Sequence, residues 1–152
     1  MPSRIAVPHC EKILEEIEAL RDELADVSEE IAQFSLAARD RVAELPSAFG
    51  ATVRLSAELA LLAANFSGVG GVVRAIRVGK RFNKDEMRSV GDIAQIALGI
   101  DDVIDAARDF RDVINLSDLR RLTTNAERLW DQLKAAADRW EVSLCSLHLS
   151  DT

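Results

Sequence analysis

Hydrophobic positions recur every three or four residues through most of this chain, which is the period of helices buried along one face. In the first run the apolar residues alternate steps of four and three: Ile13, Ile17, Leu20, Leu24, Val27, Ile31, Phe34, Ala38, Val42 and Leu45. Proline lacks a backbone N–H, so Pro46 stops this helix. The pattern predicts a first helix over residues 8–45, with Pro8 in its first turn.

A second helix is predicted over residues 48–82, and its pattern differs from the first. Between Leu55 and Val73 the only ionised residue is Glu58, so the stretch is about as long and apolar as a membrane span. Small residues recur at every fourth position along it: Ala63, Ser67, Gly71, Ala75 and Gly79. Such a stripe lets another helix approach closely, which places this helix at the centre of the predicted fold.

The polar residues of this second helix point in conflicting directions. At about 100° per residue, those before the glycines lie roughly opposite those after them. The two groups are Arg54, Glu58 and Asn65, and Arg74, Arg77 and Arg81. A straight helix cannot keep both groups in water unless partners enclose it. We therefore expect a kink or break near Gly68–Gly71.

The third helix is predicted over residues 84–115, where Asn83 and Glu86 have the spacing of a capping box. Its core face is Val90, Ile93, Ala94, Ile96, Ala97, Ile100, Val103, Ile104, Ala107, Phe110 and Ile114. Gly91 and Gly99 allow close approach, and we expect them to meet the small residues of the second helix.

The fourth helix is predicted over residues 117–147, with Ser117 as its N-cap. Its apolar face is Leu119, Leu122, Ala126, Leu129, Leu133, Ala136 or Ala137, Trp140, Leu144 and Leu147, and Trp130 beside it is expected to be a boundary or contact residue. Long helices with short connections predict an all-α fold, in which residues 1–152 form a single antiparallel up-down four-helix bundle.

The charge distribution limits the partners. The chain has a net charge of -7, so phosphate backbones repel it and nucleic acid is not an expected partner. Residues 1–45 hold eleven acids against five bases, whereas residues 46–83 hold one acid and five bases. The basic patch is Arg74, Arg77, Lys80, Arg81 and Lys84. We expect it to face the acidic sides of neighbouring helices; the alternative is an anchor for anionic lipid headgroups.

All cysteines and histidines lie in two short segments, His9-Cys10 and Cys145-Ser146-Leu147-His148. In an up-down bundle the start of the first helix and the end of the fourth lie together. Three interpretations are open: coincidence, a disulfide between Cys10 and Cys145, or a metal site using Cys10, Cys145 and His148. Coincidence is favoured, because adjacent residues on a helix point apart and nothing else indicates an oxidising compartment.

The aspartates Asp101, Asp102 and Asp105 match the DDxxD pattern, and this short motif resembles the one with which isoprenoid synthases hold magnesium. That resemblance implies a metal-assisted enzyme. It covers five residues of a chain rich in exposed charges, and a solvated helix face explains the same pattern. No catalytic triad or phosphate-binding loop accompanies it, so no catalysis, metal or cofactor is expected.

These observations favour a non-enzymatic helical bundle that mediates protein–protein interaction or assembly, with a protein partner or a second copy. The alternative is a membrane-active bundle that inserts its apolar, glycine-rich second helix. A magnesium-dependent enzyme using the third helix is the least favoured class. The amino terminus has no signal-peptide pattern, so the expected location is cytoplasmic, with peripheral membrane association under the alternative.

Overall fold

The computed structural model describes residues 2–45, 49–76 and 101–142, and these residues form an all-α structure. Its elements are α1 (Pro2–Ala43), α2 (Phe49–Ala75), α4 (Asp101–Ala107), the short 3₁₀ helix η1 (Arg108–Phe110) and α5 (Leu116–Val142). The bounds of the first helix differ from the prediction: α1 begins at Pro2, six residues before Pro8. Proline suits a first helical position because the N–H that it lacks has no partner there.

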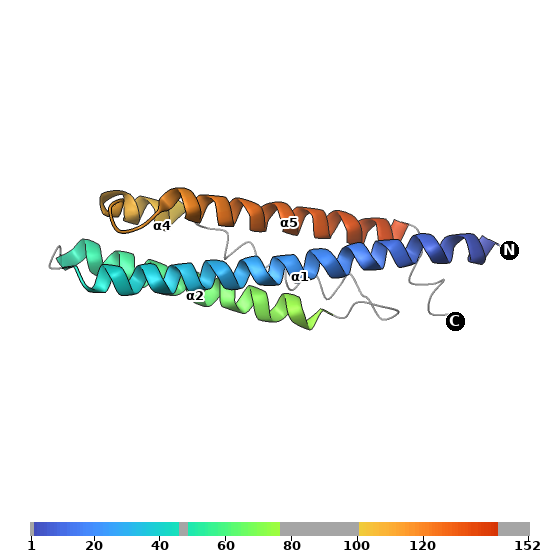
Figure 1. Ribbon diagram of the computed structural model, residues 1–152, viewed down its shortest axis with the longest axis horizontal. Coiled ribbons are helices and arrows are strands. Elements are labelled where there is room, and N and C mark those ends of the chain that lie inside the picture. Colours follow the sequence, from blue (N-terminus) through green and yellow to red (C-terminus); the bar gives the residue numbers. More distant parts are fainter. Residues whose placement is uncertain (1, 46–48, 77–100, 143–152) are drawn as a thin grey trace.

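The longest helix, α1, lies between α2 and α5 and contacts both of them. Figure 1 shows that α2 and α5 each run antiparallel to α1, while α4 lies near the start of α5. The predicted core residues of α1, from Ile13 to Val42, are buried or half-buried. A second line is buried as well: Ala25, Ser28, Ala32 and Ser35. The buried face of α1 is wide because two helices pack on it, so α1, and not the second helix, is central.

Of the kink or break predicted in the second helix near Gly68–Gly71, the break is wrong. Helix α2 continues without interruption through Gly68–Gly71 to Ala75. A methyl group built at Gly70 would meet Ala25 O at 3.6 Å and Ser28 Cβ at 3.7 Å. Packing against α1 therefore supports the helix where glycine alone would weaken it.

Helix α2 is also less enclosed than expected. Its core residues are Leu55, Leu59, Leu62, Ala63, Phe66, Val69 and Val73. All of them except Ala63 belong to one hydrophobic cluster with residues of α1, α4 and α5. The opposite side of α2 is exposed. The two groups of polar residues on opposite sides of this helix are therefore accommodated by neighbouring helices on one side and by solvent on the other.

The predicted third helix ends earlier than residue 115. Helix α4 stops at Ala107 and η1 at Phe110, and a turn follows, in which Val113 N and Ile114 N both donate to Phe110 O. The predicted core residues Val103, Ile104, Ala107, Phe110 and Ile114 are buried, as expected. Residues 77–100, including Asn83, Glu86, Gly91 and Gly99, lie outside the described residues.

Helix α5 begins at Leu116, and its N-cap is Asn115 instead of the predicted Ser117. The Asn115 side-chain oxygen accepts a hydrogen bond from Asp118 N at 3.1 Å, and Asn115 O accepts one from Leu119 N at 3.2 Å. This is the usual N-cap geometry. The predicted apolar face of α5 is buried through Trp140, and Trp130, predicted beside that face as a boundary or contact residue, is buried as well. The structure does not describe residues 143–152.

One buried hydroxyl offers a test of the packing between α1 and α2. Ser28 is fully buried, and its Oγ has no hydrogen-bond partner, whereas the Oγ of the equally buried Ser35 donates to Ile31 O at 2.8 Å. An unpaired buried polar group costs about 1–3 kcal/mol. We expect Ser28→Ala to raise the free energy of unfolding by about 1 kcal/mol. The matched Ser35→Ala variant should be neutral or less stable in the same urea titration; equal effects of the two variants would contradict this account.

Candidate interaction surface on α2

Helix α2 carries apolar residues on two opposite faces. One face forms the core against α1 and α4. The residues of the other face recur in steps of three and four and are all exposed: Gly50, Val53, Ala57, Leu61, Ala64, Gly68, Gly71 and Ala75. We call these eight residues the outer face of α2. Val53 and Leu61 are 63% and 57% exposed, so they add large aliphatic surface to this contiguous apolar face.

The outer face contains no ionisable side chain, and its glycines are open to solvent. A methyl group built at Gly50, Gly68 or Gly71 would meet nothing within 4 Å. These glycines therefore do not serve packing within the described chain. An exposed, uncharged surface of small residues allows another helix backbone to come close.

A groove of about 600 Å³ borders the outer face on the side of α1. Small residues of α2 form its floor: Ala60, Ala63, Ala64, Ser67, Gly70 and Gly71. Helix α1 supplies the opposite wall with Glu29, Ala32, Gln33, Leu36 and Arg39. The groove and the outer face share Ala64 and Gly71, so they form one continuous surface.

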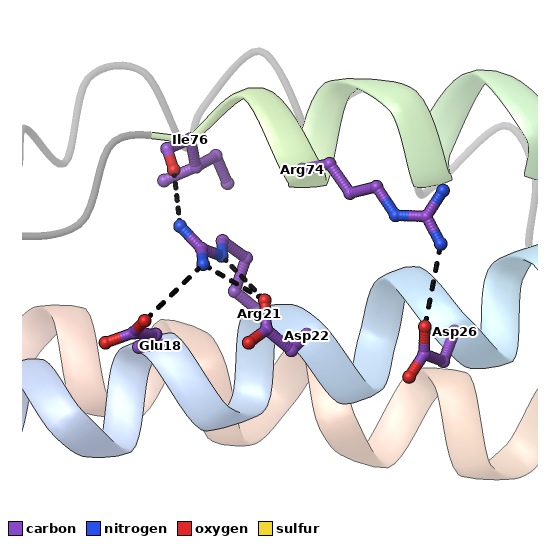
Figure 2. A network of polar contacts seen from close by, with 6 residues as sticks. All are labelled: Glu18, Arg21, Asp22, Asp26, Arg74 and Ile76. Carbon is purple, nitrogen blue, oxygen red and sulfur yellow. Dashed lines mark hydrogen bonds and ion pairs between the residues drawn. The ribbon is translucent and has the colours of Figure 1, made fainter.

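Polar contacts hold α1 and α2 together beside this groove. Arg74 Nη2 lies 2.6 Å from Glu29 Oε2 and 3.5 Å from Asp26 Oδ1. The hydrogen bond and charge of Glu29, with a smaller contribution from Asp26, raise the pKa of the Arg74 guanidinium above its ordinary value. Figure 2 shows Arg74 directed from α2 towards the acidic side of α1.

Arg21 makes a second connection, at the carboxyl end of α2. Its Nη1 donates to Ile76 O at 3.0 Å, and its Nη2 and Nε contact Asp22 Oδ1 at 3.0 and 3.1 Å (Figure 2). An arginine that donates to a terminal carbonyl caps a helix and complements its dipole. This contact therefore ties the carboxyl end of α2 to α1.

The predicted small-residue stripe does not form a single face. Ala63 is buried, whereas Ser67, Gly71 and Ala75 are exposed. Steps of four residues advance 400°, so such a stripe drifts by about 40° at each step around the helix. Of the remaining predicted contact residues, Gly79, Gly91 and Gly99 lie outside the described residues, as do Arg77, Lys80, Arg81 and Lys84 of the basic patch.

The start of α1 and the end of α5 lie side by side, as the bundle argument expected (Figure 1). Cys10 is fully buried and is not a free thiol, while His9 is exposed. Arg139 of α5 pairs with Glu16 of α1. Cys145 and His148 lie outside the described residues, so the disulfide and the metal site stay predictions.

The aspartates of the DDxxD pattern do not converge on a site in the described part of the chain. Asp102 and Asp105 are exposed, and Asp105 pairs with Arg108 at 3.4 Å; the side chain of Asp101 is not described. Within the described ranges, no group of three His, Cys, Asp or Glu side chains is arranged to hold a metal ion.

Sequence reasoning missed the outer face because both faces of α2 are apolar. The residues from Gly50 to Ala75 are long and apolar enough to cross a membrane, yet only 39% of their most apolar window is buried. The sequence does carry a signal for the outer face. Two sets of apolar residues, each recurring in steps of three and four, interleave along this one helix. A helix that is apolar all round is normally covered on all sides.

Comparison with known proteins identifies no relative of this chain: no family model, no curated protein and no solved structure matches it.

Proposed function

We propose that this chain is a non-enzymatic self-assembly module in which two copies pair through the outer face of α2. The observation that carries the proposal is this exposed, uncharged face opposite a complete set of core residues. Covering it with a second helix removes apolar area from water, which favours association by about 25 cal/mol per Å².

The choice of small residues favours a protein partner over a membrane. Helices that lie in a bilayer surface bury large residues such as Leu, Phe and Trp. On α2 most large aliphatic and aromatic side chains face the core, and only Val53 and Leu61 of the outer face are large. Alanine and glycine provide little area for lipid, but they let two helix backbones approach closely.

The outer face is complementary to itself when two copies run antiparallel. Its residues are placed nearly symmetrically about residue 62. The position numbers in the pairs 53 and 71, 57 and 68, and 61 and 64 add up to 124 or 125, so the two members of each pair lie at nearly equal distances from that centre. Val53 would then face Gly71 of the second copy, and Leu61 would face Ala64 of the second copy. Large residues meet small ones in this arrangement, as a two-fold interface requires. A parallel pair would place Leu61 against Leu61 and glycine against glycine.

Charge and area are consistent with this pairing. The protein has a net charge of -7, and two copies repel each other least through a face without carboxylates. The 26-residue stretch Gly50–Ala75 forms a strip about 39 Å long and 10–12 Å wide. Two such strips bury on the order of 1,000 Å² in total, the lower limit for a specific interface. The adjoining groove adds area, so we expect a micromolar dissociation constant.

We further propose that residues 77–100 complete an antiparallel up-down bundle. Helix α2 ends partway along α1, away from α4, and α4 packs against α2 (Figure 1). The chain must therefore return along α2, and the sequence predicts a helix over most of this segment. Its apolar residues would join the core side of α2 and leave the outer face available to a second copy.

Sedimentation equilibrium of the intact protein tests the proposed function, with vesicles of anionic phospholipid as a second arm. We expect a reversible monomer–dimer equilibrium at micromolar concentrations and no association with vesicles. A monomer at all concentrations that binds vesicles would instead support the membrane-active alternative. A monomer that does neither would overturn the proposal.

A further inference from the structure

A cluster of arginines surrounds a second cavity, where α1 ends and α5 begins, and its lining shares no residue with the outer face of α2. The cavity has a volume of about 760 Å³. Four guanidinium groups line it from different parts of the chain: Arg41 of α1, Arg108 of η1, Arg111 of the following turn and Arg120 of α5. Elements distant in sequence thus bring like charges to one place.

Most of this positive charge is not neutralised within the described residues. Arg108 pairs with Asp105 at 3.4 Å. Neither an ion pair nor a side-chain hydrogen bond links Arg41, Arg111 or Arg120 to any other described residue. Among the described lining residues the single carboxylate is Asp112, so the lining carries four positive charges and one negative charge, and the pairing of Arg108 with Asp105 leaves a net of +2. The whole chain has a net charge of -7, so the charge of this cluster is opposite in sign to that of the protein.

We propose that this cavity binds a small polyanion with two or more phosphate groups. Guanidinium groups bind phosphate oxygens through paired, charge-assisted hydrogen bonds. The volume lies in the range of small-ligand sites and exceeds what one phosphate fills. The described lining contains no aromatic side chain on which a nucleobase could stack, so the charged groups of the ligand are what the site recognises.

The arginines, and not the amino end of α5, supply most of the attraction. Asn115 already accepts a hydrogen bond from Asp118 N at 3.1 Å and so occupies one of the free donors of that helix end. Arg111 and Arg120 lie on either side of this cap in the sequence, and both line the cavity. A ligand that bridges them would hold the turn against the start of α5.

Isothermal titration calorimetry with inorganic pyrophosphate and tripolyphosphate tests the site on the intact protein. We expect one ligand per chain, with tripolyphosphate bound more tightly than orthophosphate. Arg111→Ala and Arg120→Ala should each weaken binding about tenfold or more, because each removes a charge-assisted hydrogen bond. Arg54→Ala removes the same charge from an exposed site on α2 and should leave the affinity unchanged.

The alternative outcomes are distinct. Citrate binding as tight as that of tripolyphosphate would overturn the assignment to phosphate. No measurable binding, or equal weakening by Arg54→Ala and Arg120→Ala, would overturn the site itself, because either result reduces the effect to the overall charge of the protein. All three arginines are exposed, so circular dichroism should show unchanged helix content in each variant.

Discussion

Introducing glutamate at both Leu61 and Ala64 is expected to convert the dimer into a monomer. These positions lie opposite each other across the proposed two-fold axis, so the double variant would bring four carboxylates together at the centre of the interface. Like charges that face each other in an interface cost several kcal/mol. We expect the dissociation constant to rise at least about 100-fold, measured by sedimentation equilibrium.

A control with the same added charge separates this effect from general repulsion. Ala19 of α1 and Ala135 of α5 are exposed alanines outside the outer face. The variant with Ala19→Glu and Ala135→Glu should dimerise with nearly the affinity of the original chain. Equal loss of dimer in both double variants, or a stable dimer in the Leu61 and Ala64 variant, would remove the outer face of α2 as the interface.

Reduction of a Cys10–Cys145 disulfide is the second large expected effect. A bridge between these residues closes a loop of more than 100 residues, which stabilises the folded state by about 4–5 kcal/mol in the chain-entropy model. Urea titration with and without a reducing agent should show a loss of this size. Under non-reducing, denaturing conditions, iodoacetamide should modify neither cysteine.

The variant Cys145→Ala gives an independent measure of the same bridge. Its stability without a reducing agent should match that of the reduced original chain, because both lack the cross-link. The buried site of Cys10 is left intact in this variant, so no cavity is made there. Alkylation of both cysteines in the unreduced, unfolded protein would show that no bridge exists.

The helices with one apolar face could be predicted from the sequence. The core positions of α1 and α5 follow from their three-four pattern, because only one face of each helix can be buried without burying charge. The ends of the helices were harder to predict from the sequence. Asn115 and Ser117 are both good N-caps, and only the packing of Ile114 and Leu119 into the core decides that α5 starts at Leu116.

The behaviour of α2 could not be derived in the same way. Glycines lower helix stability, and Gly68–Gly71 therefore predicted a break. Packing of Val69, Gly70 and Val73 on α1 outweighs that cost, and tertiary contacts of this kind are not visible in a local pattern. The outer face could not be predicted because alanine and glycine occur both in protein cores and on protein surfaces. Their pattern therefore does not show which side of α2 is covered by other helices.

The arginine cavity was not predictable because its members are distant in sequence. Arg41 and Arg120 come from helices separated by almost half the chain, and only the antiparallel arrangement of α1 and α5 brings them to the same end (Figure 1). In the sequence Arg41, Arg108 and Arg111 each stand beside an aspartate, and Arg120 lies two residues after Asp118, which suggests local pairing. The structure pairs Arg108 with Asp105 but leaves Arg41, Arg111 and Arg120 directed to the shared cavity.

The most direct test of self-assembly through α2 is a distance between two copies, measured by double electron–electron resonance on Ala75→Cys carrying a nitroxide label. The unsubstituted protein, treated in the same way, supplies the background. Ala75 lies 13 residues from the proposed symmetry centre at residue 62, so an antiparallel pair separates the two labels by about 40 Å. That distance, at concentrations where the dimer forms, is the predicted result. A separation below about 20 Å, as a parallel pair would give, or no intermolecular distance at all, would contradict the proposed assembly.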